Sequence, residues 1–231
     1  MAQGAEKRTA PDVGADAEQH YKKLKTGQVV EILIGQEVDP VFVSEDTLRK
    51  ASRYFTNELN TANQSGIQVT LEFPNDDLEA WKIMLYWIEH QKLPEITYEW
   101  VGESQETKNT RTLCRCWLVG EKYLVPTFQN AIMNALLYAF NFKSVALDTV
   151  KEVFCNTRPQ MPLRRVIAEE LVYATHIGKI HGDELFALDG VIGLGKSLID
   201  AKDKHAQTSR LRGARLDEGT LLWKEYMVEE D

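Results

Sequence analysis

"IQVTLEFPNDDLEAWKIMLYWIEHQKLP", residues 67–94, contains two different hydrophobic periods side by side. Its first seven residues alternate between apolar and polar, as a strand with one buried face requires. After Pro74, apolar residues recur at helical spacing until Pro94, and Asp76 with Glu79 resembles a capping box at the start. The stretch therefore predicts a half-buried strand followed by an amphipathic helix. The side chains expected in the core are Ile67, Val69, Leu71, Phe73, Leu78, Trp81, Leu85 and Ile88.

The residues before this stretch predict a strand pair and two short helices. Residues 29–35 and 41–44 are β-branched runs separated by a turn-forming segment, which is typical of a hairpin-like pair. Ser44 and Ser52 each precede a short helical pattern, so we expect both to act as helix caps. Together with residues 67–94, these elements indicate a compact α+β unit.

Two further helices are predicted after a polar loop. Residues 95–110 are expected to form this surface loop, with a short strand inside it. Residues 113–124 and 126–140 then carry helical patterns, and the proline at the start of the second suits a first helical turn. Trp87, on the preceding helix, is a candidate for exposure in an interface.

Composition limits the classes of partner and compartment. The 231 residues are 43% hydrophobic, enough for a sizeable core, and their formal net charge of −8 opposes binding to nucleic acid. The three cysteines leave one without a partner in any disulfide scheme, and no apolar run reaches the length of a membrane span. We therefore expect an intracellular protein, cytoplasmic or nuclear, that binds neither nucleic acid nor membrane. Residues 1–27 are polar and charged and are predicted to be a flexible tail.

One motif points to a different class of protein. Residues 190–197, "GVIGLGKS", match the letter pattern of a phosphate-binding P-loop, in which glycines, a lysine and a hydroxyl cradle a nucleotide. A P-loop follows a strand of a parallel sheet and needs further crossovers, but few residues follow Ser197. A P-loop nucleotide-binding protein is therefore a remote alternative. We interpret the glycines as a turn between two short helices, with Lys196 in solvent.

No catalytic, cofactor or metal site is predicted. The five histidines include no pair four residues apart, and Cys114 with Cys116 lacks the second cysteine pair of a zinc site. We expect both thiols to pack on a buried helix face, because free cysteine is among the most buried residue types. Arg164 with Arg165, and the arginines within residues 210–215, are flanked by acids, so both clusters are interpreted as solvated helix surface.

Four segments together resemble the BTB/POZ domain: "VVEILIG", "VFVSEDTLRKASRYFTNEL", "IQVTLEFPNDDLEAWKIMLYWIEHQKLP" and "WLVGEKYLVPTFQNAIMNAL". The resemblance implies an α+β fold, a cluster of helices flanked by a small sheet, over residues 28–141. Residues 142–231 then form an α-helical C-terminal extension, whose "NTRPQMPLRRVIAEE" resembles the segment that follows this domain in fungal stand-alone members. The positions that carry the family spacing are Phe42, Leu48, Ser52, Phe55, Leu71, Ala80, Leu85, Ala131 and Leu136.

The resemblance implies a non-enzymatic module for protein–protein interaction that self-associates. Members of the family often pair through the first helix, here residues 46–51, which makes Leu48 and Lys50 candidate contacts. Some members also exchange a strand that precedes the first core strand. In this chain that segment reads "YKKLKTG", and its lysines discourage pairing at a sheet edge. A weak homodimer built on helix packing is therefore expected.

A substrate adaptor of a cullin-RING ubiquitin ligase is the main alternative. Family members that recruit a cullin scaffold often carry an apolar residue, any residue and then Glu just after the second helix. In this chain the three positions hold Leu59, Asn60 and Thr61, which are therefore candidate contact residues. Since the acid is missing, we expect weak or absent binding to a cullin scaffold.

Overall fold

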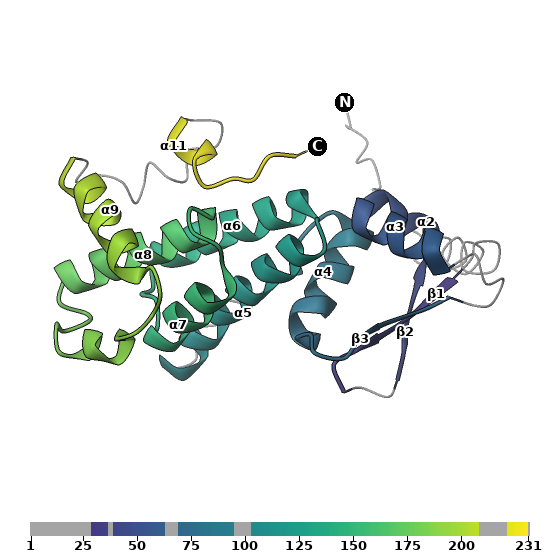
Figure 1. The fold of residues 1–231 in the computed structure, drawn as a ribbon, viewed down its shortest axis with the longest axis horizontal. Helices are drawn as coiled ribbons and strands as arrows, with labels where there is room; N and C mark the ends of the chain where they lie inside the picture. The colour runs from purple at the N-terminus through teal and green to yellow at the C-terminus, as the bar shows by residue number, and fades with distance from the viewer. Residues whose placement is uncertain (1–28, 37–38, 63–68, 95–102, 208–220, 231) are drawn as a thin grey trace, which may run out of the picture. The chain divides into compact units, whose positions relative to one another are not determined.

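The computed structural model describes residues 29–36, 39–62, 69–94, 103–207 and 221–230 (Figure 1). The chain divides into two compact units, Met1–Pro74 and Asn75–Asp231, which we call unit 1 and unit 2. Each unit has buried apolar side chains of its own. The domain limits at 28–141 and 142–231 stay predictions, and the predicted tail at 1–27 lies outside the described residues.

Unit 1 contains a three-stranded sheet formed by β1 (Val29–Ile34), β2 (Val41–Ser44) and β3 (Thr70–Phe73). β1 is central, and it pairs antiparallel with β2 and parallel with β3. The predicted strand pair is confirmed, and so is the later strand from residue 70 onward, while Ile67 lies outside the described residues. The parallel pairing is not evident from the sequence, because two helices separate the paired strands.

One face of this sheet forms much of the core of unit 1. Val30 pairs with Val43 and Ile32 pairs with Leu71, and all four side chains are buried. Because alternate residues of a strand point to opposite faces, this register brings the apolar residues of all three strands to the same side. The predicted burial of Leu71 is thereby confirmed.

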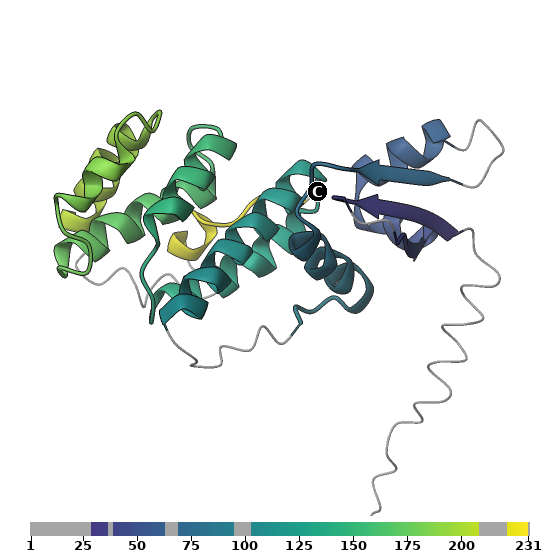
Figure 2. The ribbon, with the colours of Figure 1, turned by 90° about the horizontal axis from the view of Figure 1, so that it is seen from below.

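Two short helices, α2 (Glu45–Ala51) and α3 (Arg53–Ala62), lie on one face of the sheet (Figures 1 and 2). Ser52 caps α3 as predicted, because its Oγ accepts a hydrogen bond from the Tyr54 backbone N–H at 2.9 Å. Ser44 precedes α2 as predicted, but its side chain makes no cap hydrogen bond. The expected cap function of Ser44 is therefore wrong, and the acidic first turn of α2 favours the helix start through its charge.

The described residues of unit 2 form helices and their connections. Those from residue 142 onward are mainly helical, as the sequence predicts for the C-terminal extension. α5 packs against α4, α6 and α7, and α8 packs against α6, α7 and α9. No described helix is both long enough and apolar enough to span a membrane. The elements are α4 (Leu78–His90), α5 (Glu103–Lys122), α6 (Pro126–Phe140), α7 (Leu147–Asn156), α8 (Pro162–His176), the 3-10 helix η2 (Glu184–Leu188), α9 (Leu194–Gln207) and α11 (Leu221–Lys224).

The ends of α4 differ from the prediction at both sides. Asp77 is the N-cap, and its carboxylate accepts a hydrogen bond from the Ala80 backbone N–H at 2.9 Å. The expected capping function of Asp76 is therefore wrong. The helix ends at His90, earlier than predicted, because Gln91 adopts a left-handed conformation with φ 52°.

Asp76 is instead the acceptor at the centre of a partly buried polar cluster. Its carboxylate accepts hydrogen bonds from Trp81 Nε1 at 2.8 Å, from Lys122 Nζ at 2.5 Å and from the Tyr123 hydroxyl. Burial alone would raise the pKa of Asp76, but these donors outweigh it and hold the pKa below its ordinary value. The cluster joins the start of α4 to the end of α5.

α5 begins at Glu103, well before the helix start that the sequence predicts. The loop predicted for residues 95–110 is therefore wrong from residue 103 onward, and the short strand expected within it falls outside the described residues. The run "ESQETKNT" contains good helix formers but no apolar stripe, so hydrophobic periodicity does not detect it. Thr110 is nevertheless fully buried.

Tryptophan and cysteine side chains are buried in the core of unit 2. Trp81 is fully buried as predicted. Trp87 is also buried, with its ring centroid 5.8 Å from that of Phe128, so the hypothesis that it is exposed in an interface is wrong. Cys114 and Cys116 are buried as predicted, and burial raises the pKa of both thiols far above the ordinary value. Both thiols are therefore protonated at neutral pH and poor nucleophiles.

The C-terminal segment of unit 2 packs against α6. Asn130 on α6 donates through Nδ2 to the Val228 carbonyl at 3.0 Å and accepts from the Val228 N–H at 2.8 Å. Trp223 Nε1 donates to Asn134 Oδ1 at 2.8 Å, and Tyr226 is fully buried. Residues about a hundred positions apart in the sequence thus pair side by side.

Candidate functional site

The helix pair α2–α3 carries the interaction residues that the sequence predicts, and one arginine holds the pair together. Arg49 donates through Nε to Glu45 Oε1 at 2.7 Å. Its Nη1 donates to the Thr56 carbonyl at 3.2 Å and to Asn60 Oδ1 at 2.7 Å. The two Nη1 contacts run from α2 to α3, so they fix the position of one helix relative to the other. Sequence reasoning missed Arg49, although its i,i+4 spacing from Glu45 is a usable signal.

The charged residues of α2 follow a fixed order along the helix. Glu45 and Asp46 lie in the first turn, and Arg49 and Lys50 lie in the last turn. Lys50 Nζ is 2.5 Å from Asp46 Oδ2, and both side chains are more than 70% exposed. Such an exposed pair contributes little to stability, so its groups are available to a partner at small cost.

The five predicted interaction residues separate into two groups. Leu48 and Leu59 are fully buried in unit 1, where they contribute to its core. Lys50, Asn60 and Thr61 are exposed on α2 and α3. The Thr61 hydroxyl donates to the Asn57 carbonyl at 3.0 Å, within its own helix. The three polar residues are therefore accessible to a partner. We define the α2–α3 surface as these three residues together with Asp46.

The P-loop-like stretch forms a turn between the 3-10 helix η2 and α9. Gly190 and Gly193 both have a φ of +79°, which glycine adopts without strain. Gly195 lies inside the first turn of α9, and Lys196 is exposed as predicted. In the described part of the chain, a 3-10 helix stands where a P-loop has its strand. The interpretation as a turn between two short helices is confirmed for Gly190 and Gly193.

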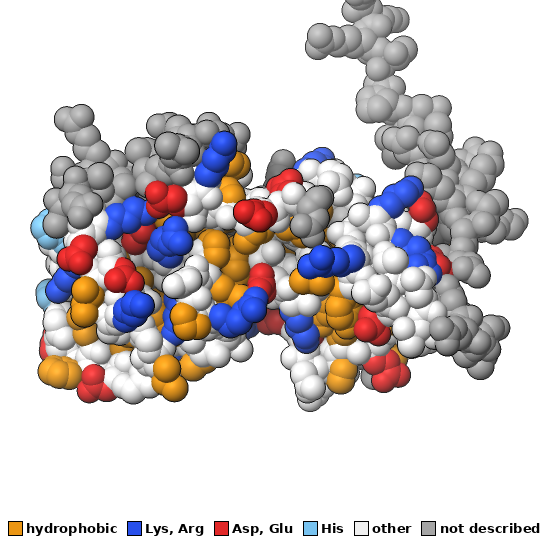
Figure 3. Space-filling view, turned by 45° about the horizontal axis from the view of Figure 1, so that its top comes forward, with side chains coloured by type: hydrophobic (Ala, Val, Ile, Leu, Met, Phe, Trp, Pro, Cys, Tyr) orange, Lys and Arg blue, Asp and Glu red, His pale blue; other side chains and the backbone are white. Residues whose placement is uncertain are grey.

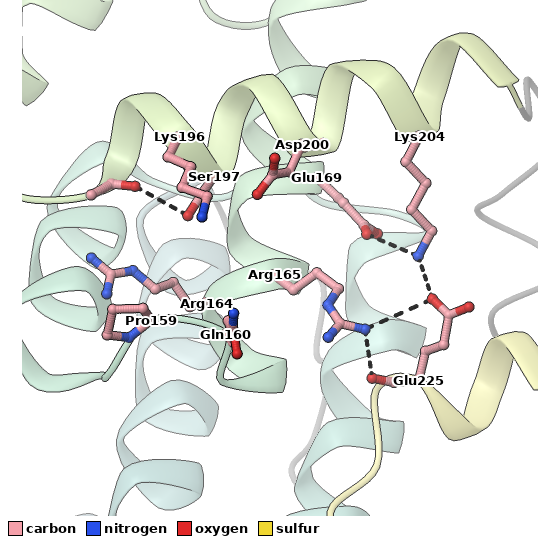
Figure 4. A pocket seen from close by; sticks show the side chains of 12 residues that line it. Pro159, Gln160, Arg164, Arg165, Glu169, Lys196, Ser197, Asp200, Lys204 and Glu225 are labelled. Carbon is pink, nitrogen blue, oxygen red and sulfur yellow. Dashed lines mark hydrogen bonds and ion pairs between the residues drawn. The ribbon is translucent and has the colours of Figure 1, made fainter.

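A cavity of about 410 Å³ lies in unit 2 beside α8, α9 and the C-terminal segment (Figure 4). At one end, Lys204 Nζ lies 2.8 Å from Glu225 Oε2, 3.0 Å from the Tyr226 hydroxyl and 3.3 Å from Glu169 Oε1. Arg165 Nη1 donates to the Glu225 carbonyl at 3.0 Å. Charge at this end is therefore balanced within the chain.

Two groups in this cluster have shifted pKa values. Burial would lower the pKa of Lys204, but its hydrogen bonds to Glu225 and Tyr226 and the charge of Glu169 raise it. Burial, with the charge of Glu169, raises the pKa of Tyr226 to about 12. Both groups therefore stay protonated at neutral pH and act as donors that hold the C-terminal segment in place.

Arg164 lines the same cavity but differs from its neighbour Arg165. Arg164 is only 5% exposed, and its guanidinium lies 4.3 Å from the ring centroid of Phe154. The interpretation of this cluster as solvated surface is therefore wrong for Arg164. Leu171 and Ala168, which follow at helical spacing on α8, are also buried and place Arg164 on the inner side. The arginines within 210–215 lie outside the described residues.

Charged side chains of both signs are interspersed on the face of the molecule drawn in Figure 3. On the face drawn in Figure 3, lysine and arginine side chains lie among aspartate and glutamate side chains, and neither sign forms a continuous field. Within the described residues, no group of three or more His, Cys, Asp or Glu side chains is placed to hold a metal ion. Cys155 is exposed and unpaired by any disulfide.

Comparisons with known proteins find matches among solved structures. No protein-family model matches the chain, and no curated protein matches it. Among solved structures, the chain is similar to the BTB (Tramtrack and Bric a brac) domain of human gigaxonin, at 12% identity and a TM-score of 0.37. The match covers 58% of this chain and 100% of that chain. A likeness at this level assigns no activity or partner to the chain.

Proposed function

We propose that the chain is a non-enzymatic protein-interaction module of BTB/POZ type that self-associates weakly through the α2–α3 surface. The observation that carries the proposal is the order of elements between Val29 and Phe140. Two strands, two helices, a third strand and three helices follow one another, and the strands form one small sheet. Local patterns in the sequence predict the same order, with a further short strand that falls outside the described residues, and the family resemblance implies a helix cluster flanked by a small sheet.

The charge order along α2 supports pairing of two copies. A two-fold interface uses the same surface patch of both copies. If a residue i of one copy contacts residue j of the other, then j of the first copy contacts i of the second. Two antiparallel α2 helices would therefore bring Lys50 of each copy toward Asp46 of the other. The intrahelical pair between these residues is exposed, so exchanging it for an intermolecular pair costs little.

A charge swap tests this pairing. Lys50→Glu places two acids opposite each other and is expected to weaken the homodimer. Adding Asp46→Lys restores opposite charges across a two-fold axis, so the double variant is expected to regain association. Light scattering after size exclusion, over a dilution series, measures the mass as it falls toward the 26.4 kDa of one chain.

Lys151→Glu is the matched control, since it makes the same charge change at an exposed pair on α7 in unit 2. In the double variant α2 loses one of its two acidic first-turn residues. Circular dichroism of each variant therefore checks that the helix remains folded. A wild-type chain that is monomeric at all concentrations would refute self-association. Equal weakening in the single and double variants would refute the two-fold pairing of α2.

The adaptor alternative uses the same helix pair but a different partner. Thr61 is exposed at the end of α3, where family members that bind a cullin scaffold often carry Glu. Titration of the wild-type chain with a purified cullin scaffold is expected to give binding weaker than about 1 µM. Tighter binding would favour the adaptor alternative over self-association as the main function.

A further inference from the structure

A buried arginine without a carboxylate partner lines the cavity of unit 2. Arg164 donates through Nη1 to the Thr157 carbonyl at 3.2 Å and through Nη2 to the Ile192 carbonyl. These acceptors are neutral, and within the described residues Arg164 forms no ion pair, while its buried Nε has no acceptor there. Buried charges in proteins are ordinarily paired, because an uncompensated charge loses its hydration without replacement. Within the described chain, the Arg164 guanidinium meets two carbonyl oxygens and the ring of Phe154, and no carboxylate neutralises its charge.

The first turn of α9 contributes further donors at the same cavity. The backbone N–H groups of Gly195 and Lys196 have no acceptor among the described residues, as is usual for the first turn of a helix. The first turn carries no acidic residue, so nothing in it offsets the positive end of the helix dipole. Lys196 is exposed and forms no ion pair with any described residue.

These groups converge on one side of the cavity. Figure 4 shows Lys196 and Ser197 extending from α9 toward the side where Arg164 lies. Gly193 makes this approach possible, because a Cβ atom there would lie 2.9 Å from Arg164 Nη2. The absence of a side chain at Gly193 thus lets the guanidinium lie directly against the turn that leads into α9.

The carboxylates that line the cavity are distributed unevenly. Glu169 and Glu225 are held by Lys204 at the other end, and Arg165 also contacts Glu225. Asp200 is exposed, one helical turn after Lys196. The end formed by Arg164, Lys196 and the first turn of α9 therefore carries the excess positive charge.

We propose that this end of the cavity binds the phosphate group of a phosphate-bearing ligand. Two cations and the amides of a helix N-terminus form the environment that a phosphate dianion prefers. The volume of about 410 Å³ suits a small ligand or a single side chain. The phosphate comes either from a small phosphate ester or from a phosphorylated side chain of a protein partner. The site lies in unit 2 and adds a function beyond the proposed self-association.

Titration of the full chain with inorganic phosphate, at ionic strength held constant with chloride, tests the site. The readout is the backbone amide shifts of Gly195 and Lys196 in nitrogen-15 spectra. We expect saturable shifts with a dissociation constant below about 1 mM, and at least about tenfold weaker binding in Lys196→Ala. Lys202→Ala removes the same charge from an exposed position on the same helix outside the cavity lining, and it is expected to bind as the wild type does.

Arg164→Gln is a second variant, and circular dichroism shows whether it folds. A folded Arg164→Gln chain is expected to have lost phosphate binding. If the variant does not fold, the comparison of Lys196→Ala with Lys202→Ala decides. Absence of saturable shifts at about 1 mM, or equal weakening in both lysine variants, would overturn the proposal. N-acetyl phosphoserine amide and glycerol 3-phosphate then distinguish the two sources, since the tighter probe identifies the source of the phosphate.

Discussion

The two units hold their charged side chains in different ways. In unit 1, the described ion pairs join residues four apart, Arg49 with Glu45 and Lys50 with Asp46. In unit 2, most described ion pairs join residues far apart in the sequence, such as Arg115 with Glu152 and Lys122 with Asp76. Local pairs form within one helix, whereas distant pairs form only after helices pack. The described ion pairs of unit 2 therefore depend on its tertiary structure much more than those of unit 1 do.

A charged cluster on α4, α5 and α7 is the clearest example in unit 2. Glu152 accepts from Arg111 Nε at 2.6 Å and from Arg115 Nε at 2.5 Å. Arg115 Nη1 also donates to Asp77, the N-cap of α4, at 2.8 Å. Burial would raise the pKa of Glu152, but the two arginines lower it below the ordinary value. The cluster ties three helices together through charge-assisted hydrogen bonds.

The largest expected effect is in the apolar core of unit 1. Leu71→Asp buries a carboxylate opposite Ile32 without a partner, so we expect a loss of more than about 4 kcal/mol in the free energy of unfolding. Urea denaturation followed by circular dichroism measures it. All five tryptophans lie in unit 2, so their fluorescence shows whether the loss spreads there. Glu72→Asp, which keeps a carboxylate at the adjacent exposed position, is the control, and an unchanged Leu71→Asp transition would show that the strand register is wrong.

A smaller but still large effect is expected at the polar cluster of unit 2. Asp76→Asn removes the charged acceptor shared by Trp81, Lys122 and Tyr123, so we expect a loss of about 2 to 3 kcal/mol. Urea denaturation followed by tryptophan fluorescence measures it. Asp148→Asn changes an exposed carboxylate on α7 and is expected to cost less than about 0.5 kcal/mol. Equal effects of the two variants would mean that the cluster does not stabilise unit 2.

Acid is expected to destabilise unit 2 through the same carboxylates. Asp76 and Glu152 have folded-state pKa values below their ordinary values of 3.8 and 4.5. Their contribution is therefore complete above these ordinary values and is lost as the pH falls through the lower folded values. Urea midpoints by fluorescence between pH 7 and pH 3 should fall in the wild type and fall less in the double variant Asp76→Asn, Glu152→Gln. Parallel curves would contradict the assignment of this loss to the two groups.

The smallest predicted effect distinguishes two serines of unit 1. Ser52→Ala removes the hydrogen bond to the Tyr54 N–H and is expected to cost about 1 kcal/mol. Ser44→Ala removes no cap hydrogen bond, so a change below about 0.5 kcal/mol is expected. Denaturation followed by circular dichroism compares the two variants. A larger loss for Ser44→Ala would show that its hydroxyl caps α2 in solution.

Local patterns in the sequence were sufficient for much of the fold. The alternation around Leu71 and the helical spacing after Pro74 predict β3 and α4, because each period reflects a face buried by one element. The start of α6 at Pro126 and the glycine turn before α9 also follow from local rules. These features depend on residues within a few positions of one another, so a single sequence contains the information needed to predict them.

Tertiary structure alone decided the rest. The parallel pairing of β1 with β3, the hydrogen bonds of Asp76 and the burial of Trp87 all depend on segments that are distant in the sequence. Arg164 shows the limit most clearly, because its flanking acids predict an exposed side chain while the packing of α8 places it inside. Whether a charged side chain is solvated or buried depends on what packs against its helix, and local composition does not contain that information.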